Sequence, residues 1–293
     1  MMDRRHFSAA LLATLASSSA LARADGKTEL QRQLAEIEKA SGGRLGVCIL
    51  DTGSGLRAGH RPDERFPMCS TFKFLAAAAV LNRVDQGKER LERRIVVTRR
   101  DLIPHAPVTE KHVGEPGLTM AELCEAAVTL SDNPAANLML ASFGGPGGLT
   151  RYLRGLGDTQ TRLDRNEPGL NESLPGDPRD TTTPAAMLDT MQKILLGDVL
   201  LPASRARIQA WLDGCLTGDK RLRAGVPADW LVGDKTGTGP RGSTCDIAIL
   251  RPPRRAPILV TAYLTGTPAS MEARDAALAS VGAVVNRASR PQS

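Results

Sequence analysis

The sequence has few of the residues that metal sites and disulfide frameworks need. Its five cysteines are an odd number, and none lies in a CxxC pair or in another spacing typical of metal ligands. Its four histidines include His6 near the N-terminus, and none forms an HxH or HExxH pattern. We therefore expect neither a disulfide scaffold nor a metal-dependent hydrolase, and no cofactor.

Long apolar runs and basic blocks are also missing after the N-terminal segment. No later stretch is apolar and long enough to span a bilayer. The formal net charge of +6 over 293 residues is mildly basic, without a lysine and arginine block of the kind that binds nucleic acid. We therefore expect no nucleic-acid partner and no stable association with a membrane.

The first 24 residues have the features of an export signal. Arg4 and Arg5 precede an apolar, small-residue run over 9–21 that is too short for a membrane span, and an Ala-Arg-Ala cleavage site follows. The arginine pair before Phe7 also resembles a twin-arginine signal. We expect residues 1–24 to be removed and the protein to be periplasmic or secreted. A short N-terminal core helix is the alternative.

Strand patterns lie at both ends of the chain, and helical patterns lie between them. Strands are predicted at 43–51, 56–60, 230–235, 244–250 and 257–264. Helices are predicted at 71–84, 119–130, 133–141, 184–196, 202–213 and 271–288, with Asn133 as an N-cap before Pro134. Residues 161–182 lack apolar periodicity and form a long loop, which in a compact domain is usually functional.

The SxxK motif at Ser70 and Lys73 gives the first candidate catalytic pair. If a helix begins at Ser70, the two residues share one face, and the Lys73 amine comes within hydrogen-bonding reach of the Ser70 hydroxyl. A neighbouring base would activate this serine, and the helix N-terminus would present N–H groups to an oxyanion. Average composition gives about one SxxK by chance in such a chain. A helix-cap serine with an exposed lysine is therefore an alternative.

Two further motifs follow in order, SDN at 131–133 and KTG at 235–237. Alone, the first could be a helix cap and the second a surface strand end. SxxK, SDN and KTG in this order form the signature of class A β-lactamases and penicillin-binding proteins. The sequence resembles class A β-lactamases over residues 30–288. The matching segments are FPMCSTFK at 66–73, PVTEKH at 107–112, MAELCEAAVTLSDNPAANLML at 120–140, TRLDRNEPGLNE at 161–172, RDTTTPAAM at 179–187 and RAGVPADWLVGDKTGTG at 223–239.

The resemblance implies an α/β (α+β) fold of the type shared by β-lactamases and penicillin-binding proteins. Its parts are an antiparallel five-stranded sheet flanked by terminal helices and an inserted all-helical domain, with the active site in the cleft between them. We expect residues 25–65 and 214–293 to form the α/β domain, and 66–213 to form the helical domain with the 161–182 loop. We also expect a monomer that acts on small β-lactam substrates.

The resemblance also implies the chemical roles of the motif residues. Ser70 is the expected nucleophile, and the backbone N–H groups of Ser70 and Thr238 resemble an oxyanion hole. Lys73 and Glu167 are both candidates for the base in acylation, whereas Glu167 acting on a water is the expected base in deacylation. Asn171 resembles the second anchor of that water. Without the matching loop sequence around it, Glu167 would be interpreted as an ordinary exposed carboxylate.

The remaining motif residues are implied to bind substrate. Ser131 is expected to pass a proton to the departing lactam nitrogen, and Asn133 to bind the side-chain amide of the substrate. Lys235 and Thr236 would contact the substrate carboxylate, together with Thr238. His105 is expected at the substrate-binding rim of the site, where many members have an aromatic residue.

Other matched positions concern the loop and the cysteines. Arg165 and Asp180 resemble the ion pair that closes the neck of the 161–182 loop, and the Glu167–Pro168 peptide bond is cis in this family. Some members have disulfides that begin at the positions of Cys124 and Cys69. The partner positions read Ala77 and Gly239 here, so neither bond can form.

One residue that commonly binds the substrate carboxylate in this family is absent from this sequence. Many members place an arginine on the strand after the KTG motif, and Thr244 occupies that position here. Other members supply the guanidinium from the segment before RAGVP, where this chain has Arg221. We expect Arg221 to reach into the cleft beside Lys235 and Thr236, because a planar guanidinium can donate two parallel hydrogen bonds to a carboxylate. A solvated arginine in a basic run is the alternative.

Two other functions share much of this pattern. A DD-peptidase has the nucleophile and Lys73 but no efficient deacylating carboxylate, and a penicillin-sensing domain keeps its acylated form as the signal. Glu167 and Asn171 in their matched loop favour a β-lactamase that hydrolyses penicillins and cephalosporins.

Overall fold

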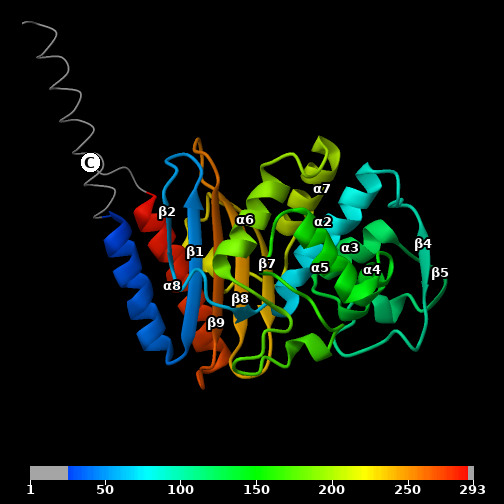
Figure 1. Cartoon of the computed structure of the whole chain (residues 1–293), viewed down its shortest axis with the longest axis horizontal. Coiled ribbons are helices and arrows are strands. Elements are labelled where there is room, and N and C mark those ends of the chain that lie inside the picture. Colours follow the sequence, from blue (N-terminus) through cyan, green and yellow to red (C-terminus); the bar gives the residue numbers. More distant parts are fainter. Residues whose placement is uncertain (1–25, 290–293) are drawn as a thin grey trace, which may run out of the picture.

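A five-stranded antiparallel sheet positions the rest of the molecule (Figure 1). The computed structural model describes residues 26–289, and the predicted signal over 1–24 lies outside them. Across the sheet the order is β2 (Arg57–His60), β1 (Arg44–Asp51), β9 (Ile258–Thr265), β8 (Thr244–Arg251) and β7 (Leu231–Thr238). All five predicted strands are therefore confirmed within a few residues, and β7 extends through the whole KTG motif.

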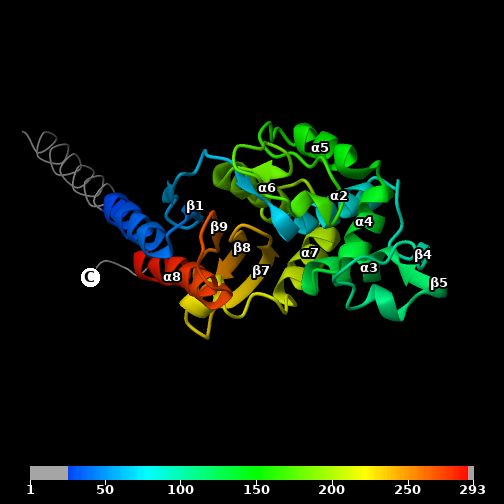
Figure 2. The same cartoon turned by 90° about the horizontal axis from the view of Figure 1, so that it is seen from below.

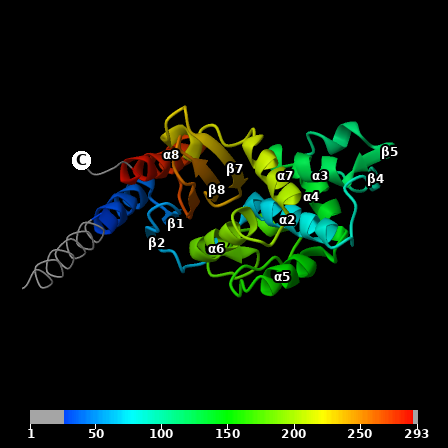
Figure 3. The same cartoon turned by 90° about the horizontal axis from the view of Figure 1, so that it is seen from above.

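The sheet separates two hydrophobic cores. A helix over 26–41 and α8 (Met271–Ala288) cover one face, where Leu34, Val47, Val260 and Val281 are buried together (Figure 2). The helical part of the chain packs on the other face and surrounds the second, larger core (Figure 3). This arrangement confirms the predicted sheet with flanking terminal helices. The domain boundaries at 65/66 and 213/214 stay a prediction.

The helices of the inserted part follow the predicted order. They are α2 (Phe72–Asp85), α3 (Met120–Thr129), α4 (Asn133–Ala141), α5 (Gly145–Gly155), α6 (Pro184–Leu195) and α7 (Pro202–Asp213). Helix α2 is buried from Phe72 to Leu81, because its alanines let the surrounding helices pack closely around it. At the start of α3, Thr119 and Glu122 form the predicted capping box.

The sequence predicts an all-helical inserted part, and this prediction is wrong in one respect, because the inserted part also contains strands. Two short antiparallel pairs lie within it, β3 (Phe66–Pro67) with β6 (Thr181–Thr182) and β4 (Arg94–Val97) with β5 (Gly114–Thr119). The sequence also did not predict α5. The glycines and proline at 144–148 suggest a turn, whereas Leu149 and Leu153 one helical turn apart supply the buried face.

The N-cap of α4 is one residue earlier than predicted. Asp132 caps the helix, and its carboxylate accepts the backbone N–H of Ala135 at 2.9 Å. The same carboxylate accepts the backbone N–H groups of Val108 and Thr109, both at 3.0 Å. Because Asp132 takes the cap, the side chain of Asn133 is free to face the lysine of the SxxK motif.

The 161–182 loop is held in place at its neck. The Arg165 guanidinium donates to the Asp180 carboxylate at 2.6 Å, as the resemblance implied, and Asp180 also accepts the backbone N–H groups of residues 164 and 165. The Glu167–Pro168 peptide bond is cis, as expected. The loop therefore presents residues 167–171 from a fixed base.

All five cysteines are free and buried, in agreement with the missing partner positions. A Cβ atom added at Gly239 would lie 2.8 Å from the Cys69 sulfur, so these two positions do face each other. Among residues 26–289 we find no helix with the length and apolar character needed to traverse a bilayer.

Candidate active site

A cavity of about 260 Å³ collects most of the predicted site residues between the sheet and the helical part. Its lining consists of Ser70, His105, Ser131, Asn133, Asn171, Thr217, Arg221, Thr236, Gly237 and Thr238. Lys73, Glu167 and Lys235 are buried behind this wall and bonded to it. All the predicted site residues therefore meet. Within the described chain, no group of His, Cys, Asp and Glu is placed to hold a metal ion.

Ser70 lies in a 3-10 turn, η1 (Cys69–Thr71), that leads into α2. Its hydroxyl lies 3.4 Å from Oε1 of Glu167 and can donate to it. The predicted hydrogen bond from Lys73 to Ser70 is not formed among the described residues. Regular α-helix starts only at Phe72, and the Lys73 amine is directed to the SDN segment instead.

Lys73 is fully buried and surrounded by acceptors. Its amine donates to the backbone oxygen of Ser131 at 2.7 Å and to Oδ1 of Asn133 at 2.5 Å, and it lies 3.3 Å from Oε1 of Glu167. Burial, with a smaller contribution from the nearby Lys235 ammonium, lowers the pKa of Lys73 to about 8, while the Glu167 carboxylate opposes the shift. The buried charge is thus paired, and its proton is unusually easy to lose.

Glu167 is held through both its backbone and its side chain. Asn137 of α4 accepts the backbone N–H of Glu167 and donates to its carbonyl oxygen, both at 3.0 Å. Asn171 donates its Nδ2 to Oε2 of the Glu167 carboxylate. The two carboxylate oxygens therefore have different neighbours, with Ser70 and Lys73 at Oε1 and Asn171 at Oε2.

The Ser131 hydroxyl lies between two ammonium groups. It accepts from Lys73 at 3.2 Å and from Lys235 at 3.1 Å. Lys235 is fully buried, and this burial lowers its pKa. With two cations donating to the Ser131 oxygen, the hydroxyl proton is directed away from both of them. Ser131 has φ +61, an uncommon backbone conformation for a residue with a side chain.

The end of β7 approaches the Ser70 turn closely enough to require glycine. A Cβ atom at Gly237 would lie 2.9 Å from the Met68 oxygen and 3.1 Å from the Ser70 nitrogen. Only glycine fits there without displacing backbone. The close approach places the backbone that follows, at Thr238, next to the turn that carries Ser70.

Arg221 lines the cavity, but its guanidinium is mostly committed to the protein. It is 6% exposed, which excludes the solvated alternative. Nε donates to Asp275, Nη1 to the carbonyl oxygens of Gly237 and Cys245, and Nη2 to the Thr238 hydroxyl. One N–H of Nη2 stays available. The prediction that Arg221 donates two parallel hydrogen bonds to the substrate carboxylate is therefore wrong for this arrangement.

Comparison with known proteins identifies the family. The profile of the β-lactamase enzyme family matches residues 29–288. The chain is 44% identical to β-lactamase OXY-1 of Klebsiella oxytoca, with 94% of each chain covered. It is 47% identical to β-lactamase L2 of Stenotrophomonas maltophilia, over 98% of this chain and 99% of that one. An ancestral class A β-lactamase structure is 65% identical with a TM-score of 0.87, and covers 88% of this chain and 99% of its own. The chain belongs to the class A β-lactamases.

Two residues of this β-lactamase site were missed by sequence reasoning. Asn137 follows Asn133 by four residues, so both lie on one face of α4, and a second amide on that face was a usable signal. Thr217, whose hydroxyl lies 2.5 Å from that of Thr236, has no such signal. It lies in an irregular segment after α7 and reaches the site only through the fold.

Proposed function

We propose that this β-lactamase opens the β-lactam ring through an acyl-enzyme on Ser70 and releases the product with a water activated by Glu167. The observation that carries the proposal is the placement of a hydroxyl, an ammonium and a carboxylate around one point. Oε1 of Glu167 lies 3.4 Å from the Ser70 hydroxyl and 3.3 Å from the Lys73 amine.

In the acylation step, Glu167 accepts the proton of the Ser70 hydroxyl as its oxygen attacks the lactam carbonyl carbon. The arrangement favours Glu167 over Lys73, because the Ser70 hydroxyl is placed to donate to Glu167 while the Lys73 amine donates to Ser131 and Asn133. The backbone N–H groups of Ser70 and Thr238 stabilise the oxyanion. The Ser131 hydroxyl then protonates the departing ring nitrogen.

In the deacylation step, a water attacks the ester carbonyl and Glu167 takes its proton. Support comes from Asn171, whose Oδ1 is buried and has no donor among the described residues. This oxygen and the Glu167 carboxylate are both acceptors, which are the partners that a water with two hydrogens can use. The two hydrogen bonds between the Asn137 side chain and the Glu167 backbone keep these acceptors in place.

Substrate binding uses the cavity wall around these groups. Lys235, Thr236 and Thr238 are the contacts for the carboxylate, and Arg221 adds its one available N–H and fixes the Thr238 hydroxyl. Asn133 has one N–H left for the substrate's side-chain amide, since its other bonds go to Lys73 and to the Pro104 oxygen.

Replacing Arg221 with alanine is expected to raise KM and to lower kcat/KM by about 10- to 150-fold. This corresponds to about 1.5–3 kcal/mol for a hydrogen bond to a charged group. The change would remove the donor to the substrate and the anchor of Thr238 together. Steady-state kinetics with benzylpenicillin measures both constants, and thermal unfolding shows whether the variant is folded. Lys220→Ala, at the exposed neighbouring residue, is the control and should stay near wild type. An unchanged KM in a folded Arg221→Ala protein would contradict the role.

The pH dependence of kcat/KM should show loss of activity as the pH rises through about 8. Lys73 has its pKa near 8, so its ammonium form is present below that pH and is lost above it. In our scheme this cation donates to Ser131 and Asn133 and pairs with Glu167, so its deprotonation weakens acylation. A profile of kcat/KM for benzylpenicillin reports groups of the free enzyme. Activity that instead rises through pH 8 would make the neutral Lys73 amine the base.

Sustained hydrolysis of a chromogenic cephalosporin tests the proposed function. We expect many turnovers per enzyme molecule without loss of rate. A DD-peptidase or a penicillin-sensing domain would give the colour change of one ring opening per protein molecule and then stop, because the opened substrate stays attached in a persistent acyl-enzyme. A burst of one equivalent from the intact protein would overturn the proposal.

We further propose that the enzyme acts as a monomer in the periplasm or outside the cell after removal of residues 1–24. Export and the removal of residues 1–24 are supported by the charged start, short apolar run and small-residue cleavage site of the sequence. The arginine pair at positions 4 and 5 favours the twin-arginine route. Mass spectrometry of the exported protein tests the cleavage site directly.

A further inference from the structure

Thr217 lines the catalytic cavity, and the reaction described above gives it no role. It lies in the irregular segment between α7 and the 3-10 turn η4 (Leu222–Gly225). Its hydroxyl oxygen lies 2.5 Å from that of Thr236 and 3.3 Å from the sulfur of Cys215. Because Thr236 is a proposed contact of the substrate carboxylate, Thr217 is one hydrogen bond away from the substrate.

The contact between the Thr217 and Thr236 hydroxyls holds only one hydrogen between its two oxygens. Each hydroxyl has a single hydrogen to donate and lone pairs that accept. If the Thr236 hydrogen lies between the oxygens, Thr236 presents only lone pairs to the cavity, and these repel a carboxylate. If the Thr217 hydrogen lies there, the Thr236 hydrogen is free to donate to the carboxylate. The donor in this pair therefore decides how readily Thr236 binds the substrate.

Cys215 favours Thr217 as the donor. Burial, with a smaller contribution from the nearby Asp234 carboxylate, raises the pKa of the Cys215 thiol, so the thiol keeps its proton at neutral pH. Its sulfur is a weak acceptor, whereas the Thr236 oxygen is a good one. This difference holds whether the thiol proton is directed to Thr217 or to Asp234. The Thr217 hydrogen is therefore more stable on the side of Thr236 than on the side of the sulfur.

The next threonine of the site shows the same arrangement with an unambiguous donor. Nη2 of Arg221 donates to the Thr238 hydroxyl oxygen at 2.7 Å, and a guanidinium can only donate, so the Thr238 hydrogen is directed elsewhere. Thr236 and Thr238 are two residues apart on β7, which places their side chains on one face of the strand, and both line the cavity. With Thr217 donating to Thr236, both threonines present a hydrogen to the same carboxylate.

We propose that Thr217 is a positioning residue, whose hydroxyl donates to Thr236 and thereby directs the Thr236 hydrogen to the substrate carboxylate. This role rests on the proposed function, in which Thr236 binds that carboxylate. The advantage is preorganisation, because the substrate does not have to turn the hydroxyl as it binds. Thr217 therefore acts on the recognition of the carboxylate and not on bond formation at Ser70.

Replacing Thr217 with valine removes the hydroxyl and keeps the shape of the side chain. For benzylpenicillin we expect kcat/KM to fall about three- to tenfold through KM, with kcat within about twofold of wild type, as for the loss of one hydrogen bond. Thr217→Ser keeps the hydroxyl and should restore kcat/KM to near the wild-type value. Steady-state kinetics measures both variants, and thermal unfolding shows whether each is folded.

Two probes without a free carboxylate separate this role from a general effect on the site. Benzylpenicillin methyl ester masks the carboxylate, and its kcat/KM should change by less than about twofold in Thr217→Val. Phenylboronic acid, whose boron adds to a serine hydroxyl, has no carboxylate at all. Its dissociation constant, measured by inhibition, should be the same for Thr217→Val and wild type.

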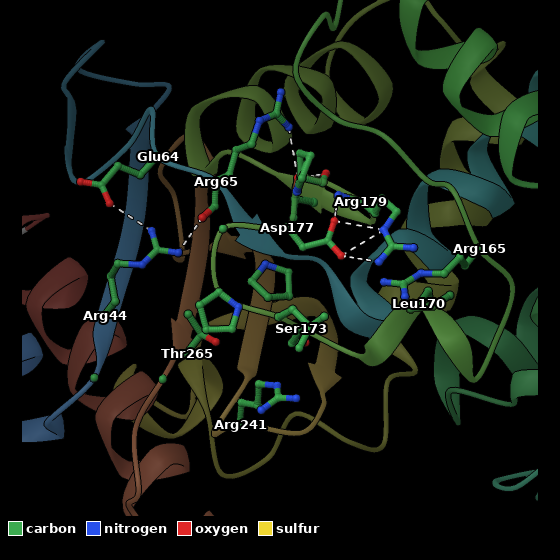
Figure 4. A pocket seen from close by; sticks show the side chains of 18 of the residues that line it. Arg44, Glu64, Arg65, Arg165, Leu170, Ser173, Asp177, Arg179, Arg241 and Thr265 are labelled. Carbon is green, nitrogen blue, oxygen red and sulfur yellow. Dashed lines mark hydrogen bonds and ion pairs between the residues drawn. The ribbon is translucent and has the colours of Figure 1, made fainter.

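Thr265 provides the matched control (Figure 4). Its hydroxyl pairs with that of Ser243 at 2.9 Å, so Thr265→Val also removes one partner from a pair of hydroxyls. Thr265 lines a separate cavity of about 570 Å³ beside the 161–182 loop, and none of the residues that line that cavity lines the catalytic one. This variant should keep the wild-type kinetic constants.

The role of Thr217 is overturned by any of three results. These are a wild-type kcat/KM for benzylpenicillin in folded Thr217→Val, an equal loss in Thr217→Ser, and an equal loss for the methyl ester or phenylboronic acid. Failure of the proposed function would differ from all three, because wild-type protein would then not turn over benzylpenicillin. That result would overturn both proposals together.

Discussion

Replacing Glu167 with alanine is expected to slow the hydrolysis of benzylpenicillin by at least about 10²–10⁴-fold, the usual contribution of a general base. Glu167 is the carboxylate that faces both the Ser70 hydroxyl and Asn171, and no other carboxylate lies within hydrogen-bonding distance of Ser70 among the described residues. Both steps lose their base, but deacylation should suffer most, because the ester of the acyl-enzyme is less reactive than the strained lactam ring and depends more on an activated water. Acylation should persist in part, since the proposed oxyanion hole and the proposed proton donor, Ser131, remain.

Glu172 provides the matched control for this variant. It is an exposed carboxylate five residues further along the same loop, and it pairs with Arg165 rather than with any group of the site. Glu172→Ala should reduce turnover by only a small factor, through the loop. Near-normal turnover by Glu167→Ala would remove Glu167 from the mechanism. Equal losses in both variants would show that the loop conformation, and not the carboxylate, is what matters.

Replacing Lys73 with methionine is expected to reduce the rate of acylation by about 10²–10⁴-fold. Methionine keeps an unbranched chain in the buried space but removes the charge that pairs with Glu167 and donates to Ser131. The change leaves the Glu167 carboxylate buried without its cation, which is costly in a water-excluded site. Stopped-flow measurement of acyl-enzyme formation with benzylpenicillin separates this step from deacylation.

Lys111→Met provides the comparison for the methionine substitution itself, because Lys111 is exposed and lies outside the cavity. This variant should acylate at the wild-type rate. Acylation by Lys73→Met within a few-fold of wild type would show that the buried ammonium is dispensable. The pH profile of the variant should also lose its fall near pH 8, since that fall is assigned to Lys73.

The sequence predicted the sheet and most helices well, because each element carries its own local pattern. The bounds predicted for α7 and α8 agree with the structure, and β7, β8 and β9 differ from prediction by at most a few residues. The candidate site residues were identified from sequence motifs and not from the local pattern of a helix or strand. The SxxK, SDN and KTG motifs and the loop segment are distinctive in combination, so the family's chemistry could be proposed for these residues before the geometry was known.

Contacts between distant segments could not be predicted. Arg221 precedes Asp275 by 54 residues, and no local pattern indicates that its guanidinium joins Asp275, Cys245 and Thr238. The short pair of β4 and β5 was missed because strand pairing depends on which segments the fold brings together. The interaction of Lys73 with Asn133 in place of Ser70 depends on a single 3-10 turn, which a count of residues along a helix does not reveal.

The most direct test of the central claim is the mass of the Glu167→Ala protein after brief incubation with benzylpenicillin. Acylation without deacylation adds the whole substrate molecule, because ring opening releases no fragment. We expect the intact protein to gain that mass once, and peptide digestion to place it on Ser70, while wild-type protein treated in the same way returns to its original mass. An adduct on another residue, or none in a variant that has lost turnover, would contradict the account.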